Sequence, residues 1–166
     1  ENSLKMYQPV YSNSTLCGAE FRITACEDIM TPDGTVRYKK GETVDTITTK
    51  NYGKAVSKQF YLGKYYVTET KAVSGYVLNR EAYPVTLKYA GQNVEITNSS
   101  ITINNKRQKA EITLTKILEV NEELGIGNND EINNVSFALY ANEEIKASDG
   151  TIIPKDGLIE IVSVSE

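Results

Sequence analysis

Residues 65–70 read Tyr-Tyr-Val-Thr-Glu-Thr (YYVTET), and this stretch decides the fold because its alternation is that of a half-buried β-strand. Successive side chains of a strand point to opposite faces, so Tyr65, Val67 and Glu69 share one face. If Tyr65 and Val67 enter a core, Glu69 enters it too. An unpaired buried carboxylate is costly. We therefore expect either that the strand ends before Glu69 or that the fold uses this carboxylate.

The same strand signal recurs along the whole chain between turn residues. Segments rich in Val, Ile, Thr and Tyr alternate with turns such as Pro32-Asp33-Gly34 and Ser74-Gly75. Short strands at this spacing are typical of a β-sandwich or barrel. The pattern predicts strands at residues 21–25, 43–48, 65–70, 83–89, 94–97, 101–103 and 112–115.

An internal repeat is the most informative feature of the sequence. Residues 18–36 (GAEFRITACEDIMTPDGTV) align without gaps on residues 134–152 (NVSFALYANEEIKASDGTI), with Phe21 and Phe137 116 positions apart. Self-similarity at a fixed offset indicates two copies of one module. The second copy ends about half-way through the module. We expect it to expose a sheet edge unless another chain or segment completes it.

Composition excludes several classes of function. The net charge is −4 and the basic residues are scattered, which argues against nucleic-acid partners and anionic membranes. No apolar run approaches the roughly 20 residues of a membrane span, so we expect no membrane insertion in this segment. The absence of histidine excludes Ser-His-Asp and Cys-His catalysis and histidine metal sites. We expect no cofactor and no metal site.

Three reactive side chains fall on the inward faces of predicted strands. Asn105 shares the parity of Ile101 and Ile103, and Lys116 shares that of the apolar positions before it, as Glu69 does in its own strand. Desolvation lowers the pKa of a lysine and raises that of a glutamate. A neutral lysine could then attack an asparagine carboxamide while the glutamate polarises the amide oxygen and shuttles protons to the departing ammonia.

The sequence resembles the Cna B-type (SpaA-like) domains of Gram-positive surface adhesins and pilins. Three stretches carry the resemblance: LCGAEF at residues 16–21, LGKYYVTET at 62–70 and AVSGYVL at 72–78, where Val73 replaces the usual proline. Residues 105–108 and 112–116 resemble the junction between two such domains. The resemblance implies an all-β, Ig-like or prealbumin-like Greek-key β-sandwich and a Lys-Asn isopeptide bond assisted by a glutamate.

Carried over residue by residue, the resemblance gives Glu69 the role of proton shuttle and Asn105 that of bond partner. The lysine is harder to place, because the position equivalent to Lys116 lies just before residue 1. Lys5 can substitute if the first loop is shorter, although it lies on the opposite face from Leu4 and Met6. Lys116 is the lysine of the second module, whose partners are absent from the chain.

We therefore expect a complete module at residues 1–108 and the N-terminal half of a second at residues 109–166. The resemblance implies a stalk or pilin-like segment of an extracellular, cell-wall-anchored protein, with the anchor and signal peptide outside this segment. Its expected partners are neighbouring modules of the same surface protein, and other copies through the incomplete second module. The alternative is a module that itself binds host matrix protein or glycan. Enzyme activity beyond one self-directed bond is not expected.

Overall fold

The computed structural model describes residues 4–8, 10–127, 131–146 and 151–164 of the chain. These residues form two compact units, one of Asn13–Ala110 and the other of Glu1–Ser12 together with Glu111–Glu166. The expected first module included residues 1–12, which here belong to the unit that contains the second repeat. We call the two units the central unit and the terminal unit.

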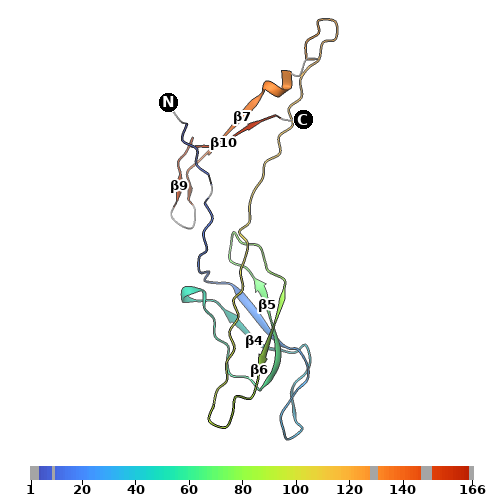
Figure 1. The fold of residues 1–166 in the computed structure, drawn as a ribbon, viewed down its shortest axis with the longest axis vertical. Coiled ribbons are helices and arrows are strands. Elements are labelled where there is room, and N and C mark those ends of the chain that lie inside the picture. The colour runs from blue at the N-terminus through green and yellow to red at the C-terminus, as the bar shows by residue number, and fades with distance from the viewer. Residues whose placement is uncertain (1–3, 9, 128–130, 147–150, 165–166) are drawn as a thin grey trace. The chain divides into compact units, whose positions relative to one another are not determined.

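The central unit is built on one antiparallel sheet of four strands in the order β4-β1-β5-β6 (Figure 1). Three registers define it: Phe21 opposite Ile47, Ile23 opposite Val67, and Tyr65 opposite Val85. The strands are β1 (Glu20–Ala25), β4 (Thr43–Thr48), β5 (Gly63–Lys71) and β6 (Ala82–Leu87).

The core of the central unit lies on one face of this sheet, as the alternation of the strands predicts. Phe21, Ile23 and Ala25 alternate inward along β1, and Tyr65 and Val67 do so along β5. The ring of Phe60 packs on that of Tyr65 with 5.3 Å between their centroids. Burying such apolar surface is the main favourable term in folding. The buried apolar residues are Ala19, Phe21, Ile23, Ala25, Ile29, Val44, Tyr65 and Val67.

The second layer over the core is extended chain rather than regular strand, and here two strand predictions were wrong. Residues 94–97 and 101–103 contain no strand, and the strand predicted at residues 112–115, in the terminal unit, is also absent. Ile103 still packs on the core, as do Val73 and Val85. We call residues 101–108 the closing segment. It pairs with another part of the chain only after Ile103, through a bridge between Tyr76 and Arg107. Alternating side chains therefore gave the correct inward face without the ladder hydrogen bonds that define a strand.

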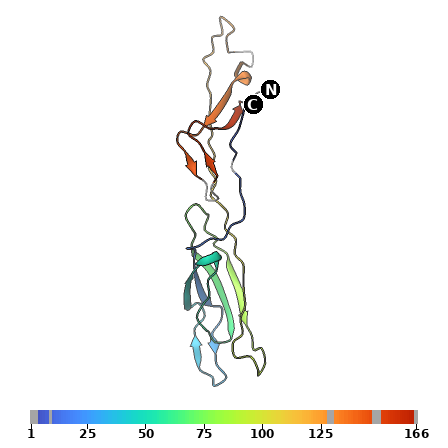
Figure 2. The same ribbon diagram turned by 90° about the vertical axis from the view of Figure 1, so that its left-hand side faces the viewer.

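The terminal unit repeats the first half of the central unit strand by strand. Strand β7 (Ser136–Tyr140) pairs with β10 (Leu158–Ser163) as β1 does with β4. A short hairpin follows β7 as another follows β1 (Figure 2). The hairpins are β2 (Ile29–Met30) with β3 (Val36–Tyr38) and β8 (Ile145–Lys146) with β9 (Ile152–Ile153).

The repeats differ in what lies beside the equivalent strands. Strand β1 has β5 on its second edge, whereas no strand of the described residues pairs with the second edge of β7. Beside β10, the backbone N–H of Tyr7 donates to the carbonyl of Leu158 at 2.8 Å. This hydrogen bond connects the N-terminal segment to the second repeat within the terminal unit.

Helical structure in the described residues is limited to two short 3-10 turns. These are η1 (Asn51–Gly53) and η2 (Glu131–Asn134). Neither is long enough to span a bilayer, and the described residues hold no other helix that could. The chain is thus nearly all-β, with antiparallel sheets in both units.

Candidate functional site

Glu69 lies in the interior of the central unit, on the face that strand parity predicts. It is the third inward residue of β5 after Tyr65 and Val67, and only 3% of its surface is exposed. Its backbone stands opposite Phe21 of β1. The strand therefore does not end before the carboxylate, and the fold must supply it with hydrogen-bond donors.

Two donors converge on one oxygen of the Glu69 carboxylate. The side-chain nitrogen Nδ2 of Asn105 lies 2.6 Å from Oε2, and the backbone N–H of Asn79 donates to the same atom at 2.7 Å. The other oxygen, Oε1, is buried and has no hydrogen-bond partner among the described residues. Because most buried polar atoms in proteins are hydrogen-bonded, Oε1 marks a place where a further donor belongs.

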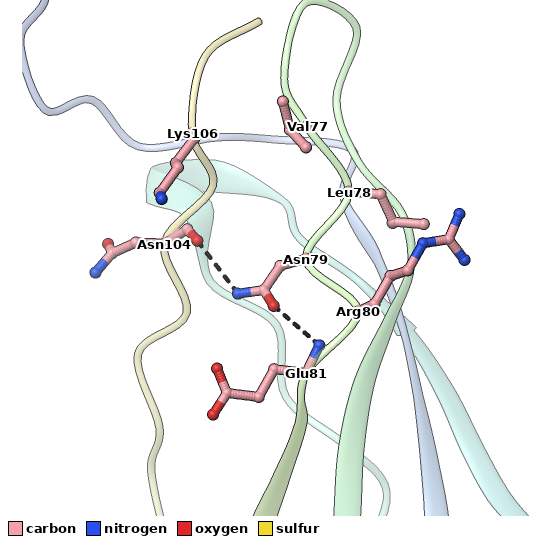
Figure 3. A pocket seen from close by; sticks show the side chains of 7 residues that line it. All are labelled: Val77, Leu78, Asn79, Arg80, Glu81, Asn104 and Lys106. Carbon is pink, nitrogen blue, oxygen red and sulfur yellow. Dashed lines mark hydrogen bonds between the residues drawn. The ribbon is translucent and has the colours of Figure 1, made fainter.

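The turn that presents Asn79 is fixed by the side chain of this residue. Its Oδ1 accepts the backbone N–H of Glu81 at 3.0 Å, and its Nδ2 donates to the hydroxyl of Tyr83 at 2.7 Å and to the carbonyl of Asn104 at 3.4 Å. Figure 3 shows Asn79 between Asn104 and Glu81. An asparagine that bonds the backbone two residues on is a common turn device.

A hollow of about 320 Å³ adjoins this turn on its outer side. Lys106 and Asn104 line it from the closing segment (Figure 3). Asn105 lies between them in the sequence and bonds Glu69 instead. The alternation along residues 103–107 is thus that of extended chain, with Asn105 inward. The hollow is lined by Val77, Leu78, Asn79, Arg80, Glu81, Asn104 and Lys106.

Asn105 is held in register by two backbone hydrogen bonds of the residues that follow it. Val77 N–H donates to the carbonyl of Lys106 at 2.8 Å, and Gln108 N–H donates to that of Gly75 at 2.9 Å. The Asn105 side chain also donates to the carbonyl of Val77 at 3.1 Å. Its carboxamide nitrogen therefore donates to two acceptors, Oε2 of Glu69 and the carbonyl of Val77.

Tyr65 supports the same strand from the core. Its hydroxyl donates to the carbonyl of Tyr61 at 2.6 Å, and its side chain is almost fully buried. Burial raises the pKa of Tyr65 to about 12, with a smaller contribution from Tyr38. The tyrosine stays neutral at physiological pH. Its packing determines which face of β5 points into the core.

The predicted site residues divide between the two units. Glu69 and Asn105 meet in the central unit, whereas Lys5 and Lys116 belong to the terminal unit and are exposed. The Nζ of Lys5 lies 4.8 Å from the centre of the Tyr7 ring. The prediction that Lys116 points inward was wrong, because residues 112–116 are extended but unpaired, and Ile112 is 72% exposed.

Asn79 is the site residue that sequence reasoning missed. Its backbone N–H reaches Glu69 through a turn, and strand parity says nothing about turns. The sequence did carry a signal for this turn. Asn79 lies shortly before strand β6, where an asparagine that bonds the backbone two residues on favours an Asx turn. The contact of Asn105 also differs from expectation, since Glu69 bonds the amide nitrogen and the predicted chemistry needed it to polarise the oxygen.

The arrangement suits acyl transfer at an amide and offers no metal site. The Asn105 carboxamide is the electrophile, and Glu69 lies beside the nitrogen that would leave. The described residues hold no cluster of three potential metal ligands. Cys17 and Cys26 are free, and the Cys17 thiol donates to the carbonyl of Lys50 at 2.8 Å.

Two comparisons with known proteins bear on the chain. The profile of the family described as SpaA, a prealbumin-like fold domain, matches residues 10–100. The "Trypsin-resistant surface T6 protein" of Streptococcus pyogenes serotype M6 is 36% identical over 69 residues. That match covers 40% of this chain and 13% of the relative, so the chain corresponds to a small part of its length.

Proposed function

Because the chain belongs to the SpaA family of prealbumin-like fold domains, we propose that it is a structural stalk segment of a bacterial surface protein. The similarity to a streptococcal surface protein supports an extracellular location. Its partners would be other modules of the same surface protein. We further propose that an isopeptide bond joins a lysine to Asn105 of the central unit, formed with the help of Glu69.

The observation that carries the cross-link is the half-satisfied carboxylate of Glu69. Oε2 has two donors, one of them the Asn105 amide, whereas Oε1 is buried and receives no hydrogen bond from the part of the chain that the structure describes. A lysine amine placed at Oε1 would complete the hydrogen bonding of the carboxylate. It would also bring the amine next to the carboxylate that the Asn105 carboxamide already contacts.

The reaction needs no external co-reactant. The neutral amine of the lysine attacks the carboxamide carbon of Asn105, which forms a new C–N bond and breaks the bond to Nδ2. The attacking nitrogen loses one proton, Glu69 passes a proton to the departing nitrogen, and ammonia leaves. Glu69 ends in its starting protonation state. The contact between Oε2 and Nδ2 suits this transfer, because the carboxyl oxygen already lies 2.6 Å from the nitrogen that would leave.

Lys5 is our candidate for the amine. It lies on the segment before β1, where the family resemblance expects the lysine, and its side chain is exposed. Lys106 neighbours Asn105 in sequence, but it lines the outer hollow beside Asn104 and so faces away from Glu69. Lys116 is the corresponding lysine of the second repeat, and we propose that it would bond a partner outside this chain.

A bond between Lys5 and Asn105 would suit a load-bearing stalk. It would close a loop of roughly 100 residues, for which the chain-entropy model gives about 4 to 5 kcal/mol of stabilisation. It would also join the segment before β1 covalently to the segment that follows β6. A pulling force would then pass through the cross-link and leave the hydrogen-bonded sheet unloaded.

Intact mass measurement of the folded protein tests the cross-link. We expect the wild-type mass to be lower than the sequence mass by one ammonia, and proteolytic fragments to contain a branched peptide that joins Asn105 to Lys5. Asn105→Ala should retain the full sequence mass. Asn104→Ala is the matched control, because Asn104 is exposed and adjacent, and it should lose ammonia as wild type does.

Three results separate the parts of the proposal. A wild-type protein of full sequence mass would refute the cross-link. A branched peptide with a different lysine would refute only the assignment of Lys5. Loss of ammonia from Asn105→Ala would show that the mass change arises elsewhere in the chain.

A further inference from the structure

The two units carry opposite net charges. The central unit holds 14 Lys and Arg against 9 Asp and Glu, a net charge of +5. The terminal unit holds 4 Lys against 13 Asp and Glu, a net charge of −9. The overall value of −4 conceals this division. Opposite charges on two parts of a chain favour contacts between unlike parts and oppose contacts between like parts.

Part of the positive charge of the central unit lies along a groove at the edge of its sheet. Strand β4 is an edge strand of the order β4-β1-β5-β6, and a groove of about 590 Å³ lies between it and residues 54–58. Lys50, Lys54 and Lys58 line this groove, and none of them makes an ion pair with a described residue. We call this groove, which these three lysines line, the lysine groove.

The lysine groove carries a net positive charge, because its three lysines outnumber its one acidic lining residue. Asp45 is its one acidic lining residue, and this carboxylate already accepts the backbone N–H groups of Thr46 at 2.9 Å and Lys58 at 3.0 Å. Val56 adds an apolar side chain that is 89% exposed. The groove therefore offers three ammonium groups and the exposed apolar side chain of Val56 beside a sheet edge without a strand partner in the described part of the chain.

The terminal unit presents a turn of complementary character. Asn121 and Ile126 pair through backbone bonds of 2.9 and 3.1 Å and close a tight turn between them. Glu119, Glu122 and Glu123 are exposed on and beside this turn and make no ion pair with a described residue. Leu124 is 71% exposed at the turn. We call residues 119–126 the acidic turn.

We propose that the acidic turn of one copy of this chain docks in the lysine groove of a second copy. The three glutamates would face the three lysines, and Leu124 would cover Val56. Charge complementarity of this kind steers encounter and fixes the register of an interface more than it adds affinity. The proposal concerns non-covalent association between copies and does not depend on the cross-link.

Such a contact joins two different surfaces, so it is heterologous. A heterologous contact leaves one free groove and one free turn on every pair, and copies can continue to add in the same direction. Copies would therefore associate head to tail, each by its terminal unit to the central unit of the next.

Sedimentation velocity at several protein concentrations tests the association. At about 0.05 M salt we expect the average mass to rise with concentration, and at about 0.5 M salt we expect monomer, because salt screens exposed charges. Monomer at every concentration in low salt would overturn the proposal. Association that persists unchanged in high salt would overturn the electrostatic docking.

Charge reversal locates the contact. Replacing Lys50, Lys54 and Lys58 by Glu should raise the dissociation constant at least about tenfold, since like charges across an interface repel. The matched control reverses three other exposed lysines of the central unit, Lys40, Lys64 and Lys88, and changes the net charge equally. Equal weakening by both triple variants would show a general charge effect and would overturn the assigned groove.

Mixing two variants gives the sharpest outcome. A second variant replaces Glu119, Glu122 and Glu123 by Lys, so that its turn and its groove are both basic, whereas the first variant has both acidic. Each variant alone should remain monomeric, and their equimolar mixture should associate. A mixture that stays monomeric would overturn the proposal, because the groove of one and the turn of the other are then still complementary.

Discussion

The carboxamide nitrogen of Asn105 lies 2.6 Å from Oε2 of Glu69, across two segments that are 36 residues apart in the sequence. The contact explains how β5 can carry a glutamate into the core, because Asn105 and the backbone N–H of Asn79 stabilise one carboxylate oxygen. The buried Oε1 atom has no such partner. The site is therefore arranged around Glu69 and has a place for one more donor.

Glu69→Gln should abolish the proposed cross-link and leave the fold in place. Glutamine keeps the shape of the side chain and can still occupy the buried position, but it cannot give a proton to the departing nitrogen. We expect the variant to have the full sequence mass and a strand content equal to wild type by circular dichroism. Glu81→Gln is the control, because Glu81 is exposed beside the same turn and should not affect the bond.

A Glu69→Gln protein that loses one ammonia as completely as wild type would contradict the role of Glu69 as proton shuttle. An unfolded variant would leave the role to be measured in another way. In that event, Glu69→Asp tests it, since a carboxylic acid one methylene shorter keeps the proton and changes only its reach. We expect slower bond formation, seen as a mixture of the two masses soon after synthesis.

The free energy of unfolding should fall at alkaline pH because of the ionisation of Tyr65. Its folded-state pKa is raised from 10.0 to about 12 by burial, so the folded protein holds this proton more tightly than the unfolded chain does. The contribution is complete below pH 10 and is lost as the pH rises toward 12. Denaturant unfolding from pH 8 upward should show the loss, and Tyr65→Phe should show less of it.

The control for Tyr65 is Tyr89→Phe. Tyr89 is 68% exposed, so removing its hydroxyl should leave the alkaline loss of stability as in wild type. Equal pH profiles for wild type and Tyr65→Phe would contradict the assignment of the alkaline transition to this residue. The Tyr65 variant should also be less stable at neutral pH, by about 1 kcal/mol, because the carbonyl of Tyr61 loses its donor.

The sequence predicted the sheet better than the layer that covers it. Strands at residues 43–48 and 65–70 matched β4 and β5, because alternation with one buried face is a local property that a single segment carries. The expected strands at 94–97 and 101–103 are extended chain. Pairing depends on a neighbour at the right spacing, and a single segment does not carry that information.

The candidate site was predictable in the same uneven way. Parity alone placed Glu69 and Asn105 on inward faces, and they meet. Asn79 was missed because it acts through a backbone N–H, which any residue type can supply. Parity failed for Lys116, since an unpaired segment has no sheet to define an inward face.

Gly63→Ala should destabilise the central unit by overpacking. A Cβ at Gly63 would lie 2.5 Å from Cδ1 of Ile29, which is 2% exposed, and the residue has a φ of +155°. Forcing an extra methyl into a close-packed core typically costs about 1–3 kcal/mol. Thermal unfolding measures the loss. Ile29→Val removes the Cδ1 atom that the new methyl would meet, so the double variant should lose less than the sum of the single variants.

Additive losses in that cycle would show that the cost of Gly63→Ala comes from the backbone conformation alone. Gly34→Ala measures such a cost separately. Gly34 has a φ of +81°, and a Cβ there would meet no atom within 4 Å. Its destabilisation should be about 1 kcal/mol. We expect it to be unchanged by Ile29→Val, because the two residues do not compete for space.

Equivalent core positions of the two repeats should differ in what they contribute to stability. Ile23 and Leu139 occupy the same place, 116 residues apart, but Ile23 is 5% exposed beside β5 and Leu139 is 37% exposed on β7. Truncating a buried aliphatic side chain costs about 2–5 kcal/mol, because contacts are lost and a cavity remains. Ile23→Ala should therefore lose that much in denaturant unfolding, and Leu139→Ala well under half of it. Equal losses would show that the inner face of β7 is covered in solution, and a strand paired with its second edge would be the expected cause.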